Sequence, residues 1–151
     1  EEAAHCFEQS LALNQDLGDH WGLGISTFNQ ASLAFATGEP AAAQTQLMHS
    51  LAHYRRAGAR HGVEECFVLL AQLAQRLGRL ERAAWSWGVV EQLEQDMGKV
   101  LPPALKPIRE QTLSALQAQM PLERFNAARA AGRRVPLDEA LRAMCEDDGS
   151  P

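Results

Sequence analysis

The sequence is poor in cysteine and has no long apolar run. Its three cysteines are widely spread and form no CxxC pair, so we expect free thiols in a reducing compartment rather than a disulfide framework. No apolar run approaches the roughly 20 residues that span a bilayer, and no signal peptide opens the chain. These absences predict a cytoplasmic protein without a membrane segment.

Basic residues are outnumbered by acidic ones, 14 to 19, which leaves a formal net charge of -5 and a pI of about 5.5. Sequence-independent nucleic-acid binding needs a basic face that displaces phosphate counterions, so we expect no direct contact with nucleic acid. A helix-turn-helix can be placed within residues 122–145. The acidic tail and the break at Pro136 favour a structural role for this segment instead.

Catalytic and metal-binding motifs are missing as well. The chain contains no GxxxxGK[ST] and no GxSxG, and we identify no cysteine with a plausible general-base partner nearby in sequence. His49 and His53 are four residues apart and share a helix face, but the general base of a zinc-protease HExxH motif is absent between them. We therefore expect no enzyme, no cofactor and no metal, and interpret the two histidines as surface residues.

What the sequence does contain is an ordinary globular composition and an internal repeat. Hydrophobic residues make up 46% of the 151 residues and charged residues 22%, which suits one domain with a core. A shift of 40 residues aligns the chain with itself without a gap. The matched pairs are Ser10/Ser50, Leu11/Leu51, Ala12/Ala52, Gly18/Gly58, Gly22/Gly62, Ala31/Ala71, Leu33/Leu73, Ala34/Ala74, Gly38/Gly78 and Gly58/Gly98.

The repeated glycines each follow a helix-forming run, where a residue with positive φ ends a helix at little steric cost. The runs predict helices at Ala3–Leu17, His20–Thr37, Pro40–Ala57, Arg60–Leu77 and Leu80–Met97. Loops of two or three residues make neighbouring helices antiparallel. Hairpins repeated at a fixed period stack into a right-handed α-α superhelix, so we predict an all-α solenoid over residues 1–98.

Two further columns of the repeat predict its core. Ala3, Ala43 and Ala83 form a small column, and Phe7, Leu47 and Trp87 form a bulky column one helical turn later. Small side chains facing large ones let paired helices interdigitate. Trp87 is therefore predicted to be a core anchor.

The repeat stops after Gly98, where Pro102 and Pro103 break the helical pattern. We predict three further helices, at Ala104–Ala118, Leu122–Ala131 and Leu137–Cys145, with Gly132 ending the second of them. Residues 99–151 would then form a helical cap with an acidic tail, within the same domain as residues 1–98.

Several of these features resemble tetratricopeptide (TPR) repeats: Ala31 and Ala71, the turns at 38–39 and 78–79, and Ala43 and Ala83. The period of 40 residues is longer than that of the standard TPR repeat. This longer period and the Gly-Asp-His-Trp-Gly turn at 18–22 are similar to repeats of large bacterial signalling ATPases and MalT-like, LuxR-type transcriptional regulators. The segments 83–103 and 125–140 are similar to the end of those repeat arrays. Pro136 departs from the family pattern, which has a Ser or Thr helix cap there.

The resemblance implies a function for the chain. It implies a non-catalytic sensor or protein-interaction domain of a larger regulator, with an upstream nucleotide-binding module in the same parent chain. The opening Glu1, which is not a Met, also leads us to expect an excerpt of a longer protein. The alternative is a general TPR adaptor that binds a peptide or self-associates, as a homodimer for example.

The resemblance also implies where binding occurs, because the first helix of each hairpin lines the concave face of such arrays. Helical spacing then predicts one stripe on His20–Thr37 and a matching stripe on Arg60–Leu77. The candidate binding residues for a small-molecule effector or a protein partner are Phe28, Ser32, Phe35, Gln72, Gln75 and Arg76. In the alternative interpretation the phenylalanines belong to the core and the polar residues are merely solvated.

Overall fold

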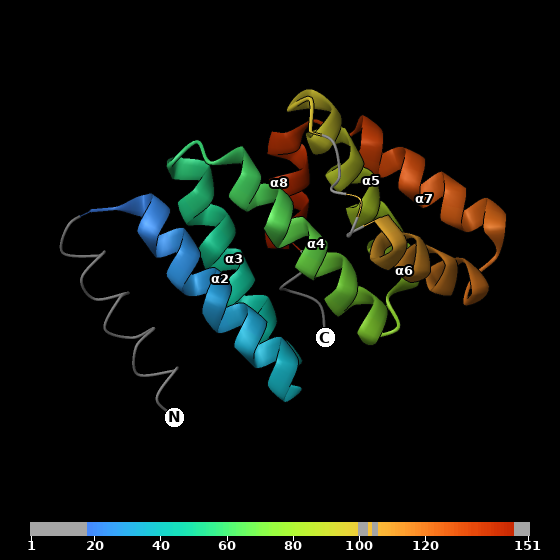
Figure 1. Cartoon of the computed structure of the whole chain (residues 1–151), viewed down its shortest axis with the longest axis horizontal. Coiled ribbons are helices and arrows are strands. Elements are labelled where there is room, and N and C mark those ends of the chain that lie inside the picture. Colours follow the sequence, from blue (N-terminus) through green and yellow to red (C-terminus); the bar gives the residue numbers. More distant parts are fainter. Residues whose placement is uncertain (1–17, 100–102, 104–105, 147–151) are drawn as a thin grey trace. The chain divides into compact units, whose positions relative to one another are not determined.

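The described part of the chain is all-α. The computed structural model describes residues 18–99, 103 and 106–146, and within them seven helices pack largely as sequential antiparallel pairs (Figure 1). The helices are α2 (His20–Thr37), α3 (Pro40–Arg56), α4 (Arg60–Arg76), α5 (Leu80–Asp96), α6 (Lys106–Ala118), α7 (Leu122–Arg134) and α8 (Leu137–Glu146). This confirms the all-α class, whereas the right-handed solenoid with a helical cap stays a prediction. The helix predicted at Ala3–Leu17 lies outside the described residues.

The turns that end α2 to α5 are built alike and recur every 20 residues. In each turn the backbone N–H of the residue after the glycine donates to the carbonyl five residues earlier, at 2.8 or 2.9 Å. The donor and acceptor pairs are Glu39/Ala34, Ala59/Tyr54, Arg79/Ala74 and Lys99/Glu94. The predicted helix-ending glycines all have positive φ: Gly18, Gly38, Gly58, Gly78 and Gly98. Only glycine adopts this backbone without strain. The repeated glycines therefore end helices, as the sequence predicted.

The chain divides into two compact units. One contains residues 1–69 and 144–151, and the other contains residues 70–143, so that the boundary falls within α4. Within the first unit α2 packs along α3, and within the second α5 packs along α7.

The core of the first unit is organised around the ring of Tyr54 on α3. A Cβ built on Gly24 of α2 would lie 2.6 Å from this ring, and one built on Gly62 of α4 would lie 2.5 Å from it. One helical turn before Tyr54 on α3, the Ser50 hydroxyl donates to the Gly24 carbonyl at 2.8 Å and accepts from the Cys66 thiol at 3.4 Å. Two glycines thus make room for one aromatic ring that three helices share.

Cys66 is a buried free thiol, as predicted. Burial raises its pKa to about 12, so the thiol stays protonated and unreactive at neutral pH. Cys6 lies outside the described residues, as does the side chain of Cys145.

In the second unit α5 and α7 approach each other at two glycines. A Cβ on Gly88 of α5 would collide with the backbone carbonyl oxygen of Arg129, and one on Gly132 of α7 would collide with that of Trp85. The prediction that Gly132 ends its helix is therefore wrong, because α7 continues to Arg134. Gly132 is needed for close packing rather than for a turn.

The predicted core columns are buried wherever they are described. Ala43, Ala83 and Leu47 are fully buried, and Trp87 retains only 4% of its exposure. This confirms Trp87 as a core residue. Ala3 and Phe7, the remaining members of these columns, lie outside the described residues.

We expect Gly88→Ala to destabilise the protein by about 1–3 kcal/mol, because the added methyl group meets backbone that cannot move away cheaply. Helix propensity alone predicts the opposite sign, a gain of about 1 kcal/mol. Urea unfolding followed by circular dichroism distinguishes the two. Ser114→Ala, at an exposed position of α6, is the control and should change the free energy of unfolding by less than about 0.5 kcal/mol. A more stable Gly88→Ala variant would contradict the close contact.

Candidate functional site

The first half of the predicted binding stripe lies on α2. Phe28, Ser32 and Phe35 follow each other at spacings of four and three residues and therefore share one face of the helix. All three side chains are half-buried. The Ser32 hydroxyl donates to the Phe28 carbonyl at 3.0 Å, which holds its side chain along the helix. This face carries two aromatic rings that the core does not fully absorb.

The second half of the stripe lies at the end of α4. Gln72 and Gln75 are half-buried, and Arg76, the last residue of the helix, is exposed. These three residues belong to the second unit, whereas Phe28, Ser32 and Phe35 belong to the first. A single groove formed by all six residues therefore stays a prediction.

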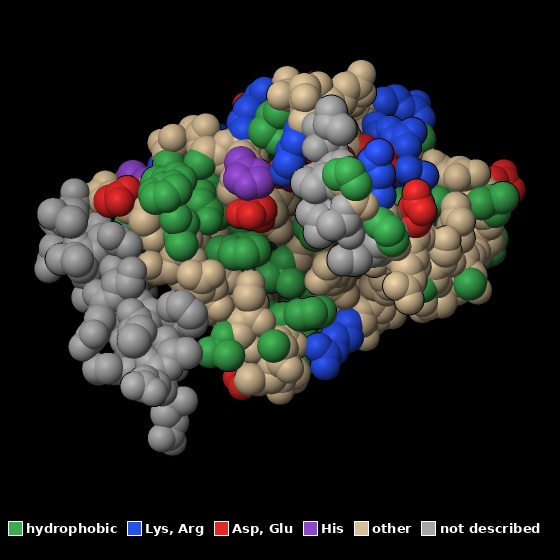
Figure 2. All heavy atoms as spheres, viewed as in Figure 1, with side chains coloured by type: hydrophobic (Ala, Val, Ile, Leu, Met, Phe, Trp, Pro, Cys, Tyr) green, Lys and Arg blue, Asp and Glu red, His purple; other side chains and the backbone are tan. Residues whose placement is uncertain are grey.

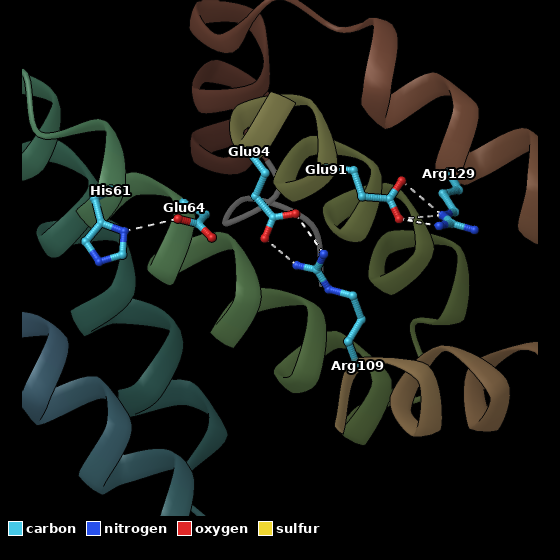
Figure 3. Close-up of polar contacts among 6 residues, drawn as sticks. All are labelled: His61, Glu64, Glu91, Glu94, Arg109 and Arg129. Carbon is cyan, nitrogen blue, oxygen red and sulfur yellow. Dashed lines mark hydrogen bonds and ion pairs between the residues drawn. The ribbon is translucent and has the colours of Figure 1, made fainter. Parts of the chain in front are cut away.

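A cluster of charged side chains joins α5 to α7 in the second unit. The Glu91 carboxylate accepts a hydrogen bond from Arg129, whose Nε lies 2.9 Å from Oε1 (Figure 3). It also accepts one from Arg133, whose Nε lies 2.5 Å from Oε2. Lys and Arg side chains gather over these two helices on the face drawn in Figure 2. Arg129 also lies over the ring of Phe125, 5.7 Å from its centroid. One carboxylate thus neutralises part of a basic surface.

A second, more buried ion pair joins α5 to α6. Arg109 donates from Nη1 and Nη2 to both oxygens of Glu94, at 2.7 and 2.6 Å (Figure 3). The guanidinium also lies over the ring of Trp87, 5.2 Å from its centroid. The side chains of Glu94 and Arg109 retain only 10% and 18% of their exposure. Bidentate pairing of this kind compensates for the loss of hydration that buried charges suffer.

Two hollows lie on the surface of the second unit. The smaller, of about 280 Å³, is lined by α5, by the end of α7 and by the connection to α8, with Leu93, Arg133 and Pro136 among its walls. The larger, of about 450 Å³, is bordered by Trp85 and by the exposed ion pair of Glu81 with Arg124. Both border residues that already pair with other side chains.

Histidines do not assemble into a metal centre in the described part of the chain. No three His, Cys, Asp or Glu side chains gather there in a way that would hold an ion. His49 is exposed, and His53 faces His20 of α2 rather than His49, with 3.3 Å between the two Nδ1 atoms. Sequence spacing alone did not indicate this partner.

The charged pairs of the second unit were also missed by the sequence analysis. One signal was available, because Glu94 lies seven residues after Trp87 and so shares its buried helix face. A carboxylate on an apolar face needs a buried partner. The identity of that partner, Arg109, was not readable, because it lies beyond the proline-rich break after Gly98.

Comparisons with known proteins add no assignment. No protein-family model, no curated protein and no solved structure matches the chain. Among the described residues, no helix is long and apolar enough to cross a membrane.

Arg109→Leu should destabilise the protein by about 3–5 kcal/mol, because it leaves the Glu94 carboxylate buried without a partner. Arg124→Leu is the matched control. It removes an exposed ion pair with Glu81, whose side chains keep 56–64% of their exposure, and should cost less than about 1 kcal/mol. Urea unfolding of both variants makes the comparison, and equal losses would contradict a specific role for the buried pair.

Trp87→Ala should lower the free energy of unfolding by about 3–5 kcal/mol, since it opens a cavity among buried side chains and removes the ring beneath Arg109. Thermal and urea melts measure this loss. Trp21→Ala, at a side chain that is 58% exposed, serves as the control and should cost much less. A nearly unchanged melt for Trp87→Ala would remove this residue from the core.

Proposed function

We propose that the chain is a non-catalytic sensor or protein-interaction domain of a larger bacterial transcriptional regulator or signal-transduction ATPase. In this proposal residues 1–98 form a right-handed, TPR-like solenoid, and residues 99–151 close it as a helical cap. An effector or a partner protein binds on the concave face. The change is passed to an upstream nucleotide-binding module of the same parent chain.

The observation that carries the proposal is the face of α2 formed by Phe28, Ser32 and Phe35. Aromatic side chains dominate the energetics of many binding interfaces, and a ring that is partly exposed in the free protein still has apolar surface to bury on binding. A serine between two such rings adds a hydroxyl that can orient a polar ligand. Full burial of both rings would have favoured a purely structural role.

Two further observations support binding rather than catalysis. The turns after α2 to α5 repeat the same hydrogen bonds every 20 residues, as expected for stacked hairpins. The most buried carboxylate of the second unit, that of Glu94, is held in a bidentate bond by Arg109 and lines neither of the two hollows described above. The role in regulation itself rests on the resemblance to regulator repeats.

The alternative is a general TPR adaptor that takes up a peptide or a second copy of the chain on the same face. A peptide that lies along α2 would use the two phenylalanines as anchor sites, and a homodimer would bury them against each other. The two functions differ in their ligand rather than in the residues that they use.

The experiment compares Ser32→Arg with Thr45→Arg. Both changes introduce arginine, a good helix former, into a helix; the first falls on the predicted binding face and the second on an exposed position of α3. Each variant and the parent protein are screened by thermal shift against small metabolites and a peptide library. A ligand of the site stabilises the parent by an amount that grows with its concentration, about 2.7 kcal/mol at 100 times its Kd.

We expect Ser32→Arg to abolish the shift and Thr45→Arg to keep it. A shift by a metabolite supports the sensor, whereas a shift by a peptide, or a dimer in light scattering that Ser32→Arg dissociates, supports the adaptor. A ligand whose shift survives Ser32→Arg would contradict this site. The absence of any ligand and of any dimer would contradict both functions.

A further inference from the structure

Two histidines meet at the open end of the first hairpin. His20 is the first residue of α2, and His53 lies in the last turn of α3, so that they lie at the end opposite the turn at Gly38. Their Nδ1 atoms are 3.3 Å apart, their ring centroids 5.5 Å apart, and the ring planes differ by 27°. The centroid separation exceeds the nitrogen separation by about two ring radii. The rings therefore meet edge to edge, with the two nitrogens facing each other.

This geometry limits the number of protons that the pair can hold. A hydrogen bond between two Nδ1 atoms needs one N–H and one lone pair, so one imidazole must be the Nδ1–H tautomer and the other must accept. A proton added to the Nε2 of the donor leaves the bond in place and makes it charge-assisted. A second proton, added to the accepting Nδ1, removes its lone pair and brings two cations together.

The surroundings of His53 add to this resistance. The pKa of His53 is lowered, first by burial and then by the positive charges of His20, Arg56 and His49. The carboxylate next to His20 in the sequence, that of Asp19, is already bound by the backbone N–H groups of Trp21 and Gly22 at the start of α2. Among the described groups that shift the pKa of His53, none is a carboxylate.

We propose that His20 and His53 form a proton-sensitive clasp between the start of α2 and the end of α3, closed with at most one added proton and opened by the second. The same arrangement does not suit a tetrahedral metal. The Nδ1 atoms of the two histidines point at each other, whereas metal ligands must point at a common third position. The proposal rests on the geometry of the first unit and does not depend on the proposed function.

The pH dependence follows from the direction of the shift. The unfolded chain has a His53 pKa of about 6.5, above that of the folded protein, so it binds more protons as the pH falls below this value. The stability from the clasp is complete above about pH 6.5 and is lost as the pH falls through the lowered pKa. Each unit of pKa difference changes the folding equilibrium tenfold.

The test is an NMR titration of the histidine side chains in the parent protein and in His20→Gln. In the parent we expect one imidazole in the Nδ1–H tautomer. We also expect the second protonation of the pair to occur at a pH well below that of the first. In His20→Gln the pKa of His53 should rise toward its ordinary value, because the neighbouring positive charge is gone. The loss of stability between pH 7.5 and 5, measured by urea unfolding, should become smaller in the same variant.

His61→Gln is the control, because His61 is exposed and pairs with Glu64 on α4 (Figure 3). It should leave the His53 titration as in the parent. Two imidazoles of the parent that are both Nε2–H tautomers and titrate independently would overturn the clasp, and this outcome does not depend on whether any variant folds. A His53 pKa that is unchanged in His20→Gln would overturn it as well.

Discussion

The packing of this chain depends on glycines at the contacts between helices, where no Cβ separates the two backbones. At Gly88 and Gly132 the backbones of α5 and α7 come so close that a single methyl group would meet a carbonyl oxygen. In the first unit Gly24 and Gly62 leave space for the Tyr54 ring. Glycine within a helix costs backbone entropy, and the tight contacts that it permits offset that cost. Where these glycines bring two helices into contact, the position of the contact determines which other side chains can reach one another.

One charged cluster of the second unit, around Glu91, follows from this close approach, and a separate ion pair joins α5 to α6. With α5 and α7 in contact, Glu91 on one helix meets two arginines on the other, and Glu94 meets Arg109 of α6. Buried ion pairs add little net stability compared with apolar packing, but breaking one is costly.

Much of the fold was predictable from local pattern. The glycine spacing located the ends of α2 to α5, and the bulky and small columns identified Leu47, Ala83 and Trp87 as buried. The error at Gly132 shows the limit of the method. A glycine that ends a helix and a glycine that permits a helix crossing look the same in one sequence, because both lack a Cβ and only the neighbouring helix distinguishes them.

The sequence by itself determined the extents of α2 to α5, the glycine turns that end them and the buried columns on α3 and α5, because these follow from φ preferences and from a period of 3.6 residues. Only the tertiary structure decided the partners: His20 with His53, Glu94 with Arg109, and Arg129 with Glu91. These pairs are separated by 33, 15 and 38 residues in the chain. No local preference acts over such distances, and packing alone brings the groups together.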